Sequence, residues 1–200
     1  MYKVGIAGAG AMGGRIGVSI KEAGYDVTLI DNWEEHVDRI NAQGMEVQTE
    51  TDTYTVEIPA VLSKDVNEQF DLIVILTKSM QSEAMLEHLQ SIGCIHDETA
   101  ILSMMNGLGH EERLSKFVPM SQIYLAVTMW TAGLRGPGQL LLEGNGTIDL
   151  QRADGEKDAR TDFILNVLNE AGLHAQISED VFKSIWSKAT LNSCLLYTSP

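Results

Sequence analysis

The segment that decides the fold reads KVGIAGAGAMGGRIGVSI at residues 3–20, and VTLID follows at residues 27–31. Residues 3–7 predict a strand, which leads into the turn Gly8-Ala9-Gly10-Ala11-Met12-Gly13. Small and apolar residues then predict a helix up to Gly24, and residues 27–30 predict a second strand that ends at Asp31. This order of strand, glycine-rich turn, helix, strand and carboxylate is far more specific than the glycine spacing alone.

Each glycine of the turn has a separate physical task in this arrangement. Gly8 permits the tight change from strand to helix, and Gly13 lets the helix lie close to the strand. Gly10 has no Cβ, so a pyrophosphate can approach the main chain at the positive end of the helix dipole. The Asp31 carboxylate can accept hydrogen bonds from the ribose hydroxyls of an adenosine. The turn and Asp31 therefore predict a dinucleotide site, and the alternative is a glycine-rich turn without a ligand.

Composition limits the classes of protein that this chain can represent. The chain has 200 residues, 44% of them hydrophobic, which suffices for one domain, or for one domain and the start of another. Its net charge of −14 argues against binding to nucleic acid or to an acidic membrane surface. Cys94 and Cys194 lack CxxC spacing and predict free thiols in a reducing compartment, the cytoplasm. The histidines lack metal-ligand spacing, so no metal site is expected.

Two apolar segments raise the question of a membrane. The longest uncharged run, residues 117–134, contains a proline, a glycine and several polar residues, and it predicts a strand and a turn rather than a membrane span. The apolar N-terminus is interrupted by Arg15 and Lys21 and already contains the glycine-rich turn, so no signal peptide is expected.

The rest of the chain alternates between helices and strands, which predicts an α/β fold with a doubly wound, mostly parallel, Rossmann-like sheet. Helices are expected at residues 34–42, 81–92, 111–117 and 156–171, and strands at residues 45–48, 54–58, 71–76, 99–104, 123–129 and 173–177. The turn Gly144-Asn145-Gly146 predicts an antiparallel hairpin of residues 139–143 with residues 147–150. In the helix at 81–92 the expected core side chains are Ala84, Met85, Leu86 and Leu89.

After Ser178 the alternation stops and a new helix is expected, with Ser178 as its N-cap. Lys188 and Asn192 lie four positions apart and share a face of this helix. That face can point into a cleft beside the sheet, and the alternative is a solvent-exposed lysine with an ordinary polar neighbour.

Five segments, in the same order, resemble the ketopantoate reductase family, also called 2-dehydropantoate 2-reductases. They are the N-terminal turn, LTKSMQ at 76–81, MNGLG at 105–109, GPG at 136–138 and IWSKATLN at 185–192. The resemblance implies a dinucleotide-binding Rossmann domain at residues 1–178 and the truncated start of an all-helical substrate domain at 179–200. It also implies that Lys188 is catalytic, that Asn106 and Asn192 are the active-site asparagines, and that Lys78 contacts the cofactor.

The chemistry implied by this resemblance is NAD(P)H-dependent reduction of a 2-oxo acid, most simply ketopantoate to pantoate in pantothenate biosynthesis. Lys188 would protonate the oxygen that becomes the alkoxide, while Asn106 and Asn192 orient the reactants. The family commonly uses NADPH, whereas Asp31 would repel a 2′-phosphate and favours NADH. A homodimer is a possible state of the full-length protein.

Two other functions remain open at this point. One is a nucleotide-binding module or fragment without catalysis, and the other is a related dehydrogenase of another 2-oxo acid or of a 3-hydroxy acid. Lys188 discriminates between reductase and module, because a reductase needs its amine at the nicotinamide.

Overall fold

The larger of two sheets contains the glycine-rich turn. The computed structural model describes residues 2–198, with only the backbone described at residues 79–80 and 191–198. The strands of this sheet lie in the order β12 (Ala175–Ile177), β11 (Ile148–Arg152), β8 (Ile123–Thr128), β7 (Ala100–Ser103), β6 (Leu72–Ile75), β1 (Lys3–Ala7), β2 (Asp26–Asp31) and β5 (Ala60–Leu62). Neighbouring strands run parallel except β8 with β11. The predicted doubly wound, mostly parallel sheet is confirmed.

The smaller sheet corrects one strand pairing. Its strands lie in the order β4 (Thr53–Val56), β3 (Met45–Gln48), β10 (Gln139–Glu143) and β9 (Thr131–Gly136). Strand β10 pairs antiparallel with β9, and β11 pairs with β8, so the predicted hairpin of residues 139–143 with 147–150 is wrong. Gly138, at φ 65°, allows the tight β9–β10 connection instead. Strand β11 returns to the larger sheet, where Ile148 and Leu150 are buried.

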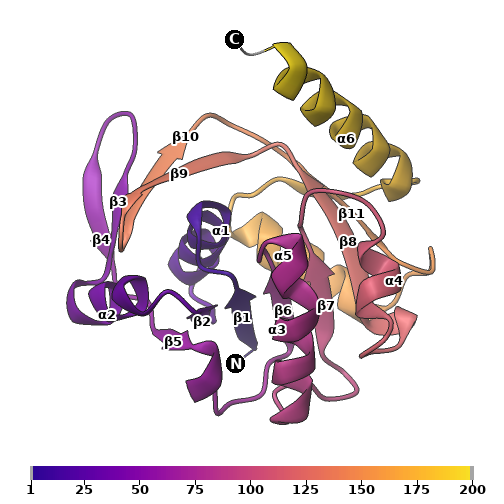
Figure 1. The fold of residues 1–200 in the computed structure, drawn as a ribbon, viewed down its shortest axis with the longest axis horizontal. Helices are drawn as coiled ribbons and strands as arrows, with labels where there is room; N and C mark the ends of the chain where they lie inside the picture. The colour runs from indigo at the N-terminus through magenta and orange to yellow at the C-terminus, as the bar shows by residue number, and fades with distance from the viewer. Residues whose placement is uncertain (1, 199–200) are drawn as a thin grey trace.

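Helices cover both faces of the larger sheet (Figure 1). The helices are α1 (Ala11–Glu22), α2 (Glu34–Gln43), α3 (Ser79–Ser91), α4 (His110–Leu114), α5 (Ala159–Glu170) and α6 (Val181–Thr198), with short 3-10 turns η1 (Ser63–Asp65) and η2 (Met120–Gln122). Side chains of α1, α2 and α5 share one core cluster with the smaller sheet, and those of α3 and α4 belong to a second cluster. Within the described residues, none of these helices is long and apolar enough to cross a membrane.

Helix α1 lies between the two sheets because its residues are small. A Cβ atom on Gly14 would lie 3.2 Å from Leu140 of the smaller sheet, and one on Gly17 would lie 2.6 Å from Leu29 of the larger sheet. Glycine at both positions lets the helix approach both layers closely. The glycine-rich turn that precedes this helix is therefore held between them.

The buried face of α3 is rotated from the predicted one. Met85, Leu86 and Leu89 are buried as expected, but Ala84 is exposed and Ser82 is buried in its place. Positions 82, 85, 86 and 89 follow the i, i+3, i+4, i+7 spacing of one helix face, which Ala84 does not share. The prediction for Ala84 is wrong because the helical period, not the apolar character of the side chain, decides which face is buried.

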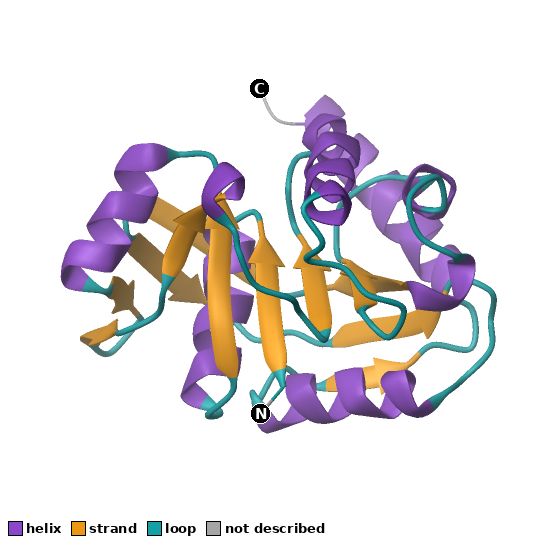
Figure 2. Ribbon diagram, turned by 90° about the horizontal axis from the view of Figure 1, so that it is seen from below, coloured by secondary structure: helices purple, strands orange, loops and turns teal. Residues whose placement is uncertain are grey.

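The N-cap of helix α6 lies two residues later than predicted. The Asp180 carboxylate accepts the backbone N–H of Lys183 at 3.0 Å, whereas the Ser178 hydroxyl accepts only the N–H of Asp180, at 3.2 Å. Asp180 is therefore the N-cap, and the prediction of Ser178 is wrong. Serine and aspartate both cap helices, so the residue type does not decide between Ser178 and Asp180. Val181 is buried in the core as the first residue of the helix, which makes Asp180 the cap. Figure 2 shows α6, which leads to the C-terminus, beyond the arrowheads of the parallel strands.

Candidate active site

The glycine-rich turn leaves open space at one glycine and none at the other two. Gly8 adopts a positive φ of 99°, and a Cβ atom on it would lie 2.7 Å from the backbone nitrogen of Thr77. A Cβ atom on Gly13 would lie 1.8 Å from the carbonyl oxygen of Gly8. A Cβ atom on Gly10, the N-cap of α1, would meet nothing within 4 Å. Gly8 and Gly13 are thus required by the fold, whereas Gly10 leaves the helix N-terminus accessible.

The carboxylate of Asp31 ties the end of β2 to this turn. One carboxylate oxygen accepts the backbone N–H of Ala9 at 2.7 Å. The other accepts the N–H groups of Asn32 at 2.7 Å and Trp33 at 3.0 Å. The side chain is half-buried beside the open space at Gly10. Asp31 therefore has a structural task in addition to the binding task that the sequence predicts.

A buried histidine holds the same turn from the opposite side. The Nδ1 atom of His36 accepts the backbone N–H of Gly138 at 2.9 Å, and its Nε2 atom lies 2.9 Å from the carbonyl oxygen of Ala9. Because a carbonyl oxygen can only accept, the proton resides on Nε2. His36 thereby joins α2, the glycine-rich turn and the β9–β10 connection of the smaller sheet.

Two adjoining cavities follow the carboxyl edge of the parallel strands. The first, of about 490 Å³, is lined by Gly8, Gly10, Asp31 and Trp33 among others. The second, of about 470 Å³, is lined by residues of the loop that follows β7, by the end of β8 and by α6. Leu76, Thr77 and Lys78 line both cavities, so the two meet at the end of β6. Ligands of doubly wound sheets bind at this edge, and an elongated ligand can extend from Asp31 to α6.

Lys188 extends from α6 into the second cavity. Its Nζ atom donates a hydrogen bond to the carbonyl oxygen of Thr128, at the end of β8, at 2.6 Å. None of the ion pairs among the described residues includes Lys188. Burial without a carboxylate partner lowers the pKa of the Lys188 amine below its usual value. Such an amine is a better proton donor than an ordinary surface lysine.

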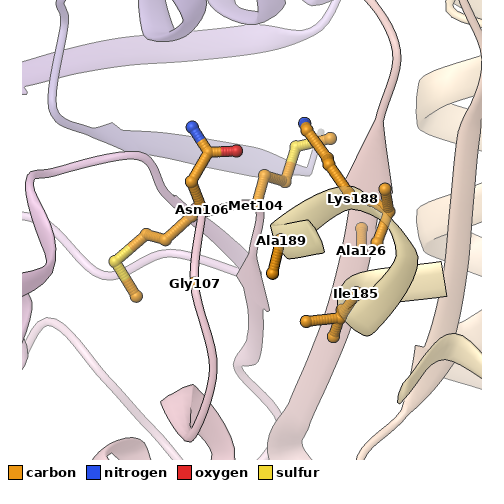
Figure 3. Close-up of a pocket in the computed structure, with 9 residues that line it drawn as sticks. Met104, Asn106, Gly107, Ala126, Ile185, Lys188 and Ala189 are labelled. Atoms are coloured by element: carbon orange, nitrogen blue, oxygen red, sulfur yellow. The ribbon is translucent and has the colours of Figure 1, made fainter. Parts of the chain in front are cut away.

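Asn106 reaches the same cavity from the loop that follows β7. Figure 3 shows the Asn106 amide and the Lys188 amine projecting in the same direction, with Met104 between them. Both residues line the second cavity as well as the small pocket drawn in that figure. The structure therefore brings together the two side chains that the resemblance singles out, although they lie on different elements.

The remaining predicted residues have separate positions. Lys78 is exposed where the two cavities meet, and Met12 lines the second cavity. Ala9 is buried beneath the turn, and Ala11 is the first residue of α1. Asn192 lies on α6 one helical turn after Lys188, but its side chain is outside the part that the structure describes.

Trp130 and Arg15 contribute to the site, although the sequence did not single them out. Trp130 lines the second cavity, and its Nε1–H donates to the carbonyl oxygen of Leu173 at 2.9 Å. The Arg15 guanidinium lies 4.0 Å from the Trp130 ring centre and donates to the carbonyl oxygens of Thr131 at 2.6 Å and Glu143 at 3.0 Å. The position of Trp130 just after a parallel strand was the one available signal.

The family model and the curated relatives identify the same family. The family model described as "Ketopantoate reductase PanE/ApbA" matches residues 4–155. A 2-dehydropantoate 2-reductase of Streptococcus pyogenes serotype M3 is 40% identical over 190 residues, which cover 95% of this chain and 61% of that protein. The Lactococcus lactis subsp. lactis enzyme of the same name is 36% identical over 195 residues, which cover 96% of this chain and 62% of that protein.

Solved structures with this fold include proteins of two names. A ternary structure of D-mandelate dehydrogenase with NADH and anilino(oxo)acetate superposes with a TM-score of 0.90 at 44% identity, over 95% of this chain and 61% of that one. A putative 2-dehydropantoate 2-reductase from Enterococcus faecalis superposes with a TM-score of 0.85 at 40% identity, with the same coverage of 95% and 61%. The chain thus spans about 61% of the length of these relatives.

Proposed function

Because the chain belongs to the ketopantoate reductase PanE/ApbA family, we propose that it forms the nucleotide-binding part of an NAD(P)H-dependent reductase of 2-oxo acids, together with the catalytic lysine. One observation carries this proposal. The cavity lined by Lys188 and Asn106 adjoins the cavity at Gly10 and Asp31, and Leu76, Thr77 and Lys78 line both. A single dinucleotide can therefore occupy the glycine-rich turn with one end and present its other end to a proton donor.

The residues of the first cavity fit the diphosphate and adenosine of such a cofactor. Open space at Gly10 lets a diphosphate approach the N-terminus of α1, where the backbone N–H groups and the helix dipole favour an anion. Asp31 would accept hydrogen bonds from the ribose hydroxyls, and Lys78 would neutralise a phosphate at the boundary between the cavities. When bound, the cofactor supplies the hydride, and the protein supplies orientation and electrostatics.

Lys188 supplies the proton in this mechanism. An ammonium group has three N–H donors, and the carbonyl oxygen of Thr128 uses one of them. The others can donate to the oxygen of the 2-oxo group, which becomes negatively charged as its carbon is reduced. The lowered pKa of Lys188 eases release of the proton to that oxygen. Asn106 orients the reactants, and we assign the same task to Asn192, one helical turn beyond the lysine.

The first candidate substrate is ketopantoate, which the names of the curated relatives support. We expect the full-length enzyme that carries this chain to oxidise NADH or NADPH when ketopantoate is added. Loss of cofactor absorbance and formation of pantoate measure this reaction. Cofactor binding without turnover on any 2-oxo acid would favour a binding module instead.

A second candidate is another 2-oxo acid, because the D-mandelate dehydrogenase structure is as similar to this chain as the pantoate enzymes are. Phenylglyoxylate, the 2-oxo acid that corresponds to mandelate, is the substrate to compare. A kcat/KM for phenylglyoxylate above that for ketopantoate would assign the second substrate and leave the proposed reaction class unchanged.

We expect the protein to prefer NADH to NADPH, since the Asp31 carboxylate repels a 2′-phosphate and accepts from a 2′-hydroxyl. Asp31→Arg should shift the ratio of the two Kd values toward NADPH by tenfold or more, about 1.4 kcal/mol. Affinity for both cofactors should also fall, because Asp31 accepts the N–H of Ala9. Calorimetric titration measures both effects.

The matched control is Asp38→Arg, which makes the same charge change on the exposed surface of α2. That variant should keep the parental ratio of the Kd values for NADH and NADPH. Binding of NADPH tenfold more tightly than NADH by the parent would contradict the assignment of Asp31.

Location, partners and domain boundaries belong to the same proposal. We propose that the partner of this protein is its small-molecule substrate and not nucleic acid, because a net charge of −14 repels a polyanion. The buried free thiol of Cys94 supports a cytoplasmic location, and Cys194 lies outside the described side chains. We place the domain boundary near residue 178, just before α6, and expect the full-length enzyme to form a homodimer.

A further inference from the structure

The loop that carries Asn106 contains two glycines in left-handed conformations. Gly107 and Gly109, both in this loop between β7 and α4, have positive φ values of 109° and 73°. Glycines lose more backbone entropy on ordering than other residues, so a loop with two of them needs an external contact to hold one conformation. Asn106 itself is exposed at the cavity, where its own side chain contributes no packing to the core.

His110 supplies that contact. Its Nε2 atom lies 3.0 Å from the carbonyl oxygen of Asn106, and the ring is 3% exposed at the start of α4. Since a carbonyl can only accept, Nε2 carries the proton and donates it. Within the part of the chain that the structure describes, this is the one hydrogen bond recorded for Asn106.

The other ring nitrogen of His110 indicates that stability alone does not explain this residue. Its Nδ1 atom is buried and has no hydrogen-bond partner in the described structure. A buried polar atom without a partner costs free energy, and an apolar ring of similar size would avoid that cost. The contact to Asn106 is therefore the interaction that a phenylalanine could not provide.

We infer that His110 is a positioning residue that fixes Asn106 against the nicotinamide end of the cofactor. This inference rests on the proposed function, because it assigns Asn106 to the nicotinamide side of the second cavity. It predicts an effect that is confined to one end of the dinucleotide. Gly8, Gly10 and Asp31 line the first cavity, and His110 is not among the residues that line it.

The test compares NADH with ADP-ribose, which has the adenosine and diphosphate but no nicotinamide. His110→Phe keeps the ring volume and removes the donor. We expect it to weaken NADH binding roughly tenfold, the scale of one lost positioning contact, and to change ADP-ribose binding less than about twofold. His110→Gln places an amide N–H near the original Nε2 position and should restore NADH binding. Calorimetry on the 200-residue chain measures both ligands.

Two further variants separate positioning from general stability. Gln122→Leu removes buried hydrogen bonds to the carbonyl oxygens of His96 and Thr99 at the opposite edge of the sheet, and it should leave the ratio of the two affinities unchanged. In an Asn106→Ala background, His110→Phe should have little additional effect on NADH binding, because the two residues act as one unit.

The outcomes distinguish this inference from the function on which it rests. An equal loss of NADH and ADP-ribose affinity, a failure of His110→Gln to restore binding, or additive effects with Asn106→Ala would overturn the role of His110 and leave the proposed function intact. Absence of NADH binding by the parent chain would overturn the proposed function itself, and the inference with it.

Discussion

Replacement of Lys188 by alanine is expected to lower turnover of the full-length enzyme by roughly two to four orders of magnitude, the range typical of a positioned general acid. Cofactor affinity should stay near the parental value, because Lys188 lines the second cavity, whereas Gly8, Gly10 and Asp31 line the first. Asn106→Ala should reduce turnover less, because an amide orients reactants but transfers no proton. Steady-state kinetics and cofactor titration on the same preparations measure the two effects separately.

The chain offers a matched control on the same helix. Lys183 is an exposed lysine of α6, and only its backbone N–H contributes to the cap by Asp180. Lys183→Ala should therefore leave turnover unchanged. Normal turnover in Lys188→Ala, or an equal loss in Lys183→Ala, would show that the assignment of the proton donor is wrong. Strong ketopantoate reduction by residues 1–200 alone would show that the relatives' additional length is not needed for the substrate site.

Replacement of Gly10 by valine is expected to abolish cofactor binding, with a Kd at least about a hundredfold higher, some 2.7 kcal/mol, while the fold persists. The N-cap position of Gly10 has φ −60° and ψ −165°, an extended conformation that valine also adopts. A Cβ atom there meets no protein atom within 4 Å, so the valine side chain would occupy the space that we assign to the diphosphate of the cofactor. Calorimetry measures the affinity, and thermal unfolding followed by circular dichroism measures the fold.

Other glycines provide the contrast. A Cβ atom on Gly13 would lie 1.8 Å from a carbonyl oxygen, so Gly13→Ala should lower the melting temperature as well as the affinity. Gly133 lies in strand β9, away from the turn, and a Cβ atom there would be in ordinary contact with Leu141 at 3.7 Å. Gly133→Ala should therefore change neither the melting temperature nor the cofactor affinity strongly. Unchanged NADH affinity in Gly10→Val would contradict the assignment of the turn.

The local sequence was sufficient to predict the features whose physical cause is local. The turn at residues 8–13 is specified by glycines that no other residue can replace at φ 99° or at a backbone approach below 3 Å. The uniformly apolar strand at residues 72–75 can lie only inside a sheet that is covered on both faces. These two features lead to a doubly wound sheet and to its carboxyl edge as the place of the site.

Strand pairing in the C-terminal half required the tertiary structure. The two glycine-rich connections at 136–138 and 144–146 are equally good turn signals in the sequence. Two long-range pairings decide which of these two turns closes a hairpin. Strand β10 pairs with β3, about ninety residues earlier, and with β9, whereas β11 returns to β8. Contacts at that separation leave no trace in a local pattern.

The residue types of the site were predictable, but their environment was not. Asn106 was singled out by resemblance alone and Lys188 by its helix spacing and that resemblance, and only the fold brings α6 and the β7–α4 loop to one cavity. The carbonyl oxygen of Thr128 at Lys188, the His110 contact to Asn106 and the Arg15 guanidinium over Trp130 each join residues through backbone atoms or ring faces. Backbone carbonyls and ring faces carry no sequence signature, so the partners that tune and position this site become visible only when the chain is folded.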